Sequence, residues 1–130
     1  MSPVVEHAEQ LATEHDATLH AIHVTNTASL ADLPMESSWE GVSQALKQQG
    51  ENAVEDVMAE LSGDVAVKTV VLDGSPAKEI VEYAEENCDC IVMGTHGRSG
   101  VDRLLIGSVA ERVVRSAPVP VTTISVDAEV

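Results

Sequence analysis

One stretch decides how this chain folds: Cys90-Ile-Val-Met-Gly94-Thr-His-Gly97-Arg-Ser-Gly-Val-Asp-Arg-Leu-Leu-Ile-Gly107-Ser108-Val-Ala-Glu111. Its apolar run at 91–93 is typical of a parallel strand that is covered on both faces. Gly94 and Gly97 end this run and let the backbone approach another group closely. We expect Ser108 to be the N-cap of a helix, with Glu111 completing a capping box.

A strand that leads through a glycine loop into a helix start is typical of an anion site. Free backbone N–H groups and the positive end of the helix dipole point at the same place there. We therefore expect this stretch to hold the phosphate groups of a nucleotide. All four arginines lie between residues 98 and 115, and Arg98 and Arg103 flank the loop. We expect Arg115 to be an ordinary surface residue near acidic side chains.

The remaining residues alternate between helical and strand patterns. Apolar spacing predicts helices over about 3–14, 39–61, 76–87 and 109–116, and strands over 18–24, 65–72, 91–93 and 121–126. Gly50 is expected to weaken the second helix, Ser75 to cap the third, and Asn87 to end it. Residues 25–38 are expected to form a long loop, either a lid or simply disordered. The alternation predicts an α/β fold with a parallel sheet.

Composition limits the function. The length of 130 residues predicts one domain over 1–130. The net charge of −15 argues against a nucleic-acid partner, because it would repel the phosphates. Only Trp39 and Tyr83 are aromatic, so base-stacking platforms are missing as well. There is no apolar run long enough for a membrane span and no signal-peptide pattern, so we expect a cytoplasmic protein. The acidity, with few lysines, suggests adaptation to high salt.

Candidate catalytic and metal-binding groups are few. Cys88 and Cys90 are too close in sequence for an unstrained disulfide, and we expect reduced, partly buried thiols. His20 and His23 are predicted on opposite faces of a strand, so they do not form a metal pair. His96, in the glycine loop, is expected to donate a hydrogen bond rather than to act as an acid or base. We expect no catalytic residue, and slow ATP hydrolysis is the least supported activity.

The glycine spacing G-x2-G-x9-G-S, from Gly94 to Ser108, resembles the nucleotide-binding signature of the universal stress protein family. The resemblance extends to Gly-Ser-Pro at 74–76, to Ala-Pro-Val-Pro-Val at 117–121 and to the segment 16–24, so it covers nearly the whole chain. It implies a Rossmann-like parallel sheet of the adenine-nucleotide alpha hydrolase type and a role in the stress response. It also implies ATP, with Mg or Mn accompanying the nucleotide, and a homodimer through the last strand, Val121–Val126.

The resemblance also implies which residues contact the nucleotide. They are Val24, Met93, Gly94, Gly97, Gly107, Ser108 and Val109. The glycines and the serine would contact phosphate and ribose, the methionine and Val109 would line the nucleotide, and Val24 would meet adenine through its backbone. Arg98 is expected near the phosphates from its position alone.

The chain departs from the family at its front. Family members begin with a strand in the middle of the sheet, followed by a loop with an Asp that contacts the nucleotide, whereas Met1 falls at the start of the family's first helix. We therefore expect four strands in an N-terminally truncated domain. The neighbouring strands would close the gap, a partner would fill it, or the sheet would carry a defect. Weak or absent ATP binding is expected for this chain alone. The alternative function is a ligand-free dimeric interaction module.

Overall fold

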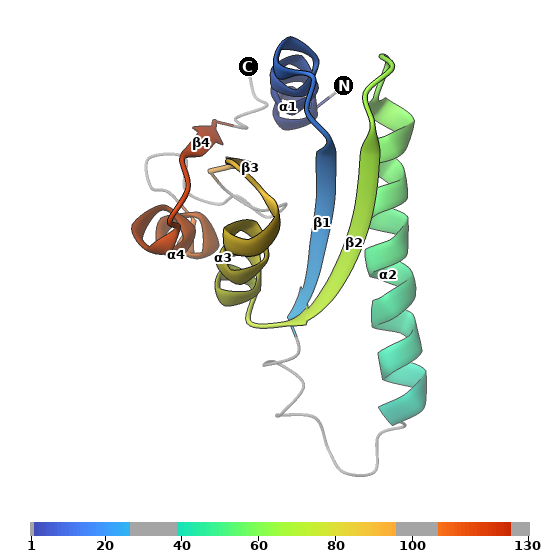
Figure 1. Ribbon diagram of the computed structural model, residues 1–130. Coiled ribbons are helices and arrows are strands. Elements are labelled where there is room, and N and C mark those ends of the chain that lie inside the picture. Colours follow the sequence, from blue (N-terminus) through green and yellow to red (C-terminus); the bar gives the residue numbers. More distant parts are fainter. Residues whose placement is uncertain (1, 27–38, 96–106, 126–130) are drawn as a thin grey trace.

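The computed structural model describes residues 2–26, 39–95 and 107–125, in which four helices alternate with four strands (Figure 1). The elements are α1 (Pro3–His15), β1 (Leu19–Asn26), α2 (Trp39–Glu60), β2 (Val67–Gly74), α3 (Pro76–Asn87), β3 (Ile91–Gly94), α4 (Ser108–Ser116) and β4 (Val121–Ile124). The predicted α/β class is therefore confirmed. Most of the predicted long loop and of the glycine loop lies outside the described residues.

The described strands form two parallel pairs. In the first pair, β1 lies beside β2, with Leu19 opposite Val67 at one end and Asn26 opposite Gly74 at the other. In the second pair, β3 lies beside β4, with Ile91 opposite Val121 and Gly94 opposite Ile124. Within the described ranges these are two separate two-stranded sheets, and β1 and β3 are not hydrogen-bonded to each other. The strands are parallel, as predicted, but one edge of β1 and one of β3 have no strand partner among the described residues.

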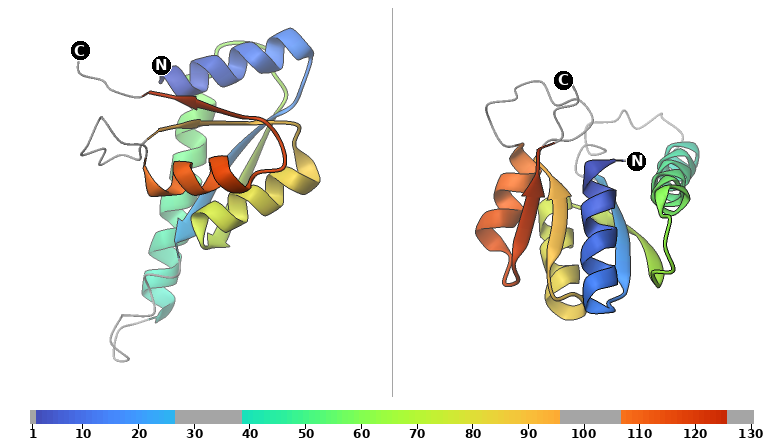
Figure 2. Two further views of the ribbon diagram at one scale, coloured as in Figure 1. Left: turned by 90° about the vertical axis from the view of Figure 1, so that its left-hand side faces the viewer. Right: turned by 90° about the horizontal axis from the view of Figure 1, so that it is seen from above.

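Helices cover both faces of the strands. In Figure 2 (left), β3 and β4 run between α1 above and α3 and α4 below, and both point toward the side on which α1 begins. On β1, the His20 ring contacts Tyr83 of α3, whereas His23 lies beside Gly50 of α2. The two histidines therefore occupy opposite faces of the strand, as predicted. β1 is thus covered by α3 on one side and by α2 on the other.

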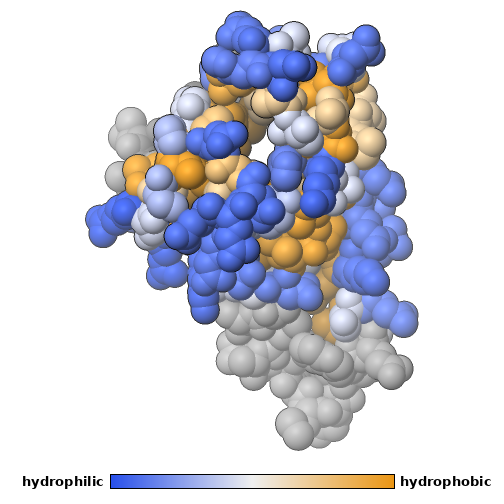
Figure 3. Space-filling model, viewed as in Figure 1, coloured by the Kyte–Doolittle hydropathy of each residue, from blue (hydrophilic) through white to orange (hydrophobic). Residues whose placement is uncertain are grey.

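The least exposed of the described residues belong to α3 and α4. Ala84, Ala110 and Val113 have exposed fractions of 1%, 3% and 0%. By contrast, every residue of β3 is only half-buried. The surface is correspondingly hollowed between α1 and the strands below it in the space-filling view (Figure 3). Apolar side chains of the strands therefore keep contact with water that a continuous, fully covered sheet would remove.

Helix α1 begins as its sequence predicts, and it is hydrogen-bonded to the segment that follows α2. The Ser2 hydroxyl accepts a hydrogen bond from the Val4 N–H at 3.2 Å, Pro3 is the first helical residue, and Asp16 closes the helix in the left-handed conformation. The buried carboxylate of Glu9 accepts hydrogen bonds from the backbone N–H groups of Ser62 and Gly63, just after α2. These bonds hold α1 above the strands.

Two predicted caps are wrong. The N-cap of α4 is Gly107, whose carbonyl accepts the Glu111 N–H at 2.9 Å, so Ser108 is the first helical residue and cannot form the predicted capping box. The last residue of α3 is Asn87, and Cys88 is its C-cap. Ser75 does occupy the N-cap position of α3, but its side chain makes no capping hydrogen bond. Backbone geometry, rather than side-chain type, decides these helix ends.

Gly50 has a packing role that its helix propensity does not indicate. It is buried in α2, and a Cβ atom there would lie 2.9 Å from both His23 Cδ2 and Val71 Cγ1. The glycine therefore allows α2 to lie close against the β1–β2 pair. Even α2, the longest described helix, lacks the continuous apolar length that crossing a bilayer needs.

Both cysteines are free thiols; Cys88 is half-buried and Cys90 is exposed. The pKa of the Cys88 thiol is raised by burial and, to a lesser extent, by the neighbouring Asp89 and Cys90. A pKa that is raised on folding stabilises the protein below the unfolded pKa, and this contribution is lost as the pH rises through the folded value.

We therefore expect the urea midpoint to fall between about pH 8 and pH 10, where thiols ionise, and to fall less in Cys88→Ser. Burial also raises the pKa of Tyr83, so both proteins should lose some stability at still higher pH. Cys90→Ser is the matched control and should keep most of the decrease, because burial is the main cause of the raised pKa of Cys88 and Cys90 contributes least. Equal losses in all three proteins would show that Cys88 does not cause the decrease.

Candidate nucleotide site

The carboxyl end of β3 is joined directly to the start of α4. Gly94 is the register partner of Ile124, and the Thr95 N–H donates to the Ile124 carbonyl at 2.9 Å. The Thr95 carbonyl in turn accepts the Gly107 N–H at 2.6 Å. The two ends of the glycine-containing segment therefore meet at the strand end. This is the edge at which open parallel α/β sheets bind ligands.

The first turn of α4 offers hydrogen-bond donors to an anion. Its N-cap is a glycine, so no side chain caps the first N–H groups. Ser108 is exposed, and its hydroxyl is at the surface. The acid of the first turn, Glu111, forms an ion pair with Arg115 at 3.0 Å, which offsets part of its charge. A phosphate group could therefore bind here through backbone N–H groups, the Ser108 hydroxyl and the helix dipole.

The predicted site residues fall into three groups. Met93 and Gly94 in β3 come together with Gly107, Ser108 and Val109 at the start of α4. Val24 lies in the other strand pair, opposite Leu72 of β2. Gly97 and Arg98, like Arg103, lie outside the described residues. The structure thus brings five of the predicted residues close together and leaves Val24 on a separate pair of strands.

No feature of the sequence pointed to Thr25, which follows Val24 near the end of β1. Thr25 is only 6% exposed, and its Oγ1 atom has no hydrogen-bond partner in the part of the chain that the structure describes. A buried hydroxyl without a partner is unfavourable and is often explained by a ligand or a water molecule. The strand pattern alone does not distinguish this threonine from one with a satisfied hydroxyl.

Replacing Thr25 with valine should raise the free energy of unfolding by about 1 kcal/mol, because the shape is kept and the unsatisfied hydroxyl is removed. Chemical denaturation of the nucleotide-free protein measures the change. Thr69→Val, at an exposed position of β2, is the control and should have little effect. A clear loss of stability in Thr25→Val would mean that the hydroxyl is satisfied in solution.

Within the described ranges, no group of three or more His, Cys, Asp or Glu side chains could hold a metal ion. Arg115 is a surface residue near an acid, as predicted, and that acid is Glu111 on the same helix rather than one on a neighbouring helix.

Comparison with known proteins identifies the relatives of this fold. The model of the universal stress protein family matches residues 2–125. This chain belongs to the universal stress protein family. Universal stress protein MJ0531 of Methanocaldococcus jannaschii is 47% identical over 122 residues, which are 92% of this chain and 71% of that protein. The solved structure of protein MJ0577 superposes with a TM-score of 0.80 at 27% identity, over 94% of this chain and 85% of that chain.

Two further structures of the family were solved with nucleotides. One is a universal stress protein in complex with cAMP, with a TM-score of 0.57 at 21% identity over 95% of this chain and 85% of that chain. The other is the universal stress protein of Archaeoglobus fulgidus in complex with dAMP, with a TM-score of 0.59 at 20% identity over 94% of this chain and 85% of that chain. At these identities the superpositions establish a shared fold.

Proposed function

We propose that this chain is a cytoplasmic regulatory protein of the stress response that binds an adenine nucleotide, ATP with Mg or Mn. The phosphate groups of the nucleotide bind at the start of α4. The observation that carries the proposal is the 2.6 Å hydrogen bond from the Gly107 N–H to the Thr95 carbonyl, which sets an uncapped helix start beside Gly94. The binding of cAMP and dAMP by two relatives supports an adenine nucleotide as the ligand.

We also propose that a further strand belongs between β1 and β3. The support is the division of the described strands into two pairs, together with the hollow below α1 (Figure 3). Such a strand would run beside Val24 and Met93 and would bring the two halves of the site into one sheet. Without it, the adenine contact and the phosphate contact are held independently, and ATP affinity is low.

A second function, a ligand-free interaction module, is favoured by the same divided arrangement. β4 pairs with β3 on one side, and its other edge is open within the described residues. Val119, Val121 and Ile124 give this edge an apolar character, and such an edge can pair with a second copy. A homodimer through β4 fits either function.

Titration of the chain with ATP, followed by backbone amide NMR, distinguishes the two functions. Nucleotide binding predicts saturable shifts at Thr95, Gly107, Ser108 and Val109. Ser108→Glu should abolish them, because it places a negative charge where the phosphate binds, while an acid in the first turn leaves α4 stable. Ser43→Glu, on an exposed position of α2, should bind as the original chain does. If millimolar ATP causes no saturable shift, the ligand-free module is the correct function.

A further inference from the structure

A groove of about 310 Å³ lies between α3 and α4, on residues that are separate from the proposed nucleotide site. Ala77 and Val81 of α3 contribute apolar surface to its lining. Lys78 of α3 and Arg112 of α4 contribute positive charge to it. The volume is at the small end of the range of roughly 300–1,000 Å³ that ligand pockets occupy, so a compact molecule would fill it.

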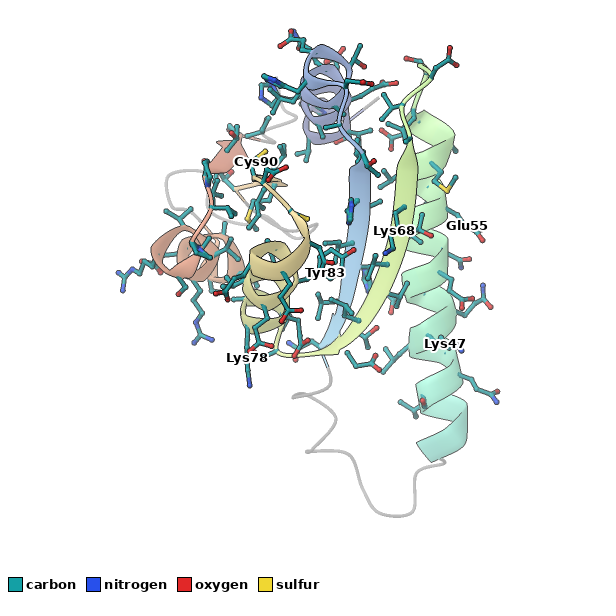
Figure 4. All side chains as sticks on the ribbon, in the orientation of Figure 1. Lys47, Glu55, Lys68, Lys78, Tyr83 and Cys90 are labelled. Atoms are coloured by element: carbon teal, nitrogen blue, oxygen red, sulfur yellow. The ribbon has the colours of Figure 1, made fainter. Side chains whose placement is uncertain are left out.

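The groove gathers positive charge in a chain whose net charge is −15. Lys78 and Arg112 come from different helices, and the structure records no ion pair between either of them and a described carboxylate. Arg115, by contrast, is on the same helix as Arg112 and is paired with Glu111 at 3.0 Å. Figure 4 shows Lys78 near the beginning of α3, extending away from the strands. The two cationic groups are therefore available to an anion.

Hydroxyl groups stand beside these two cations. Ser75, at the N-cap position of α3, makes no capping hydrogen bond with its side chain, and it lines the groove. Ser116, the last residue of α4, lines the groove beside Arg112. Lysine, arginine and hydroxyl donors together are the groups that bind phosphate oxygens in proteins. Glu82 is the one acid of the lining and would repel such a ligand.

We propose that this groove binds a small organic phosphate with a compact apolar body. The phosphate lies between Lys78 and Arg112 and accepts hydrogen bonds from the serine hydroxyls. The apolar body covers Ala77 and Val81. Glu82 lowers the affinity through like-charge repulsion. None of these residues belongs to the β3 end or to the first turn of α4, so this site and the nucleotide site can be tested independently.

Phenyl phosphate is the probe, titrated into the full chain and followed by amide NMR. Saturable shifts are expected at Ser75, Lys78, Arg112 and Ser116. Inorganic phosphate should bind more weakly because it buries no apolar surface, and benzyl alcohol should not bind because it carries no charge. Equal binding of benzyl alcohol, or shifts centred on Thr95 and Gly107, would overturn the proposal.

Variants separate the role of charge from that of folding. Lys78→Gln and Arg112→Gln should each weaken phenyl phosphate binding about tenfold, as expected for the loss of a charge-assisted hydrogen bond. Arg115→Gln, which removes a cation outside the groove, is the matched control and should bind normally. Glu82→Gln should bind several-fold more tightly, a gain that a damaged fold would not produce. Unchanged affinity in both Lys78→Gln and Arg112→Gln would overturn the proposal.

Discussion

Replacing Gly50 with valine should lower the free energy of unfolding by about 3 kcal/mol, the largest loss that we expect from one substitution in this chain. By helix propensity alone, either alanine or valine would be favoured over glycine in α2. The Cβ atom, however, would lie 2.9 Å from His23 Cδ2 and 2.9 Å from Val71 Cγ1. Both neighbours stand on hydrogen-bonded strands and cannot move aside without disturbing β1 and β2.

Chemical denaturation of Gly50→Val, Gly50→Ala and Gly41→Ala tests this expectation. Gly50→Ala should lose about 1–2 kcal/mol, because the overlap exceeds the gain of up to about 1 kcal/mol from propensity. Gly41→Ala, at an exposed position of the same helix, should show only that gain. In a double-mutant cycle, Val71→Ala should relieve part of the Gly50→Ala loss. Strict additivity, or a stabilised Gly50→Ala, would show that α2 does not lie close to the strands.

Joining an apolar strand to the front of α1 should raise ATP affinity at least tenfold and should also stabilise the fold. β3 and β4 end on the side where α1 begins, so a short loop can connect a strand added beside β3 to Ser2 (Figure 2). A strand placed between β1 and β3 would satisfy the open edges of both, and its connection through α1 to β1 would be the usual right-handed crossover. Helices cover this position on both faces, so the strand should be apolar throughout.

The test protein carries six added apolar, β-branched residues and a short Asp-containing loop in front of Ser2. Calorimetry with ATP measures its affinity, and thermal unfolding measures its stability. A matched version with lysines at two central strand positions cannot be buried there and should behave as the original chain does. Amide exchange should slow in β1 and β3 only with the apolar version. If both versions bind ATP equally, or if exchange in β1 and β3 does not change, no strand belongs between them.

Local signals in the sequence predicted most of the fold. Ser2-Pro3 predicted the start of α1, and the β-branched run at 65–72 predicted β2 to within two residues. These signals work because caps and alternation depend on neighbours in the chain. The N-cap of α4 was predicted one residue too late, because a serine is a better cap by its side chain, whereas the backbone conformation of Gly107 decides where the helix begins.

Features that depend on contacts between distant segments were not predicted. The burial of Gly50 against His23 and Val71, and the unsatisfied hydroxyl of Thr25, arise only once α2 is packed on the strands. The groove between α3 and α4 combines Lys78 with Arg112, which no sequence spacing relates. For the site, the glycine spacing predicts a phosphate contact at Gly94, Gly107 and Ser108, which the structure brings close together. The predicted adenine contact at Val24 comes from the family resemblance and not from spacing, and Val24 lies on the other strand pair.

Paramagnetic broadening by Mn–ATP tests the central claim most directly, because it locates the triphosphate on the protein. Signals of Thr95 and of Gly107, Ser108 and Val109 should broaden first, with an affinity weaker than micromolar, and excess Mg–ATP should reverse the effect. Mn alone, measured in parallel, identifies broadening that comes only from the acidic surface. Broadening centred elsewhere, such as at the Lys78–Arg112 groove, or a submicromolar affinity for ATP, would contradict an incomplete nucleotide site at the start of α4.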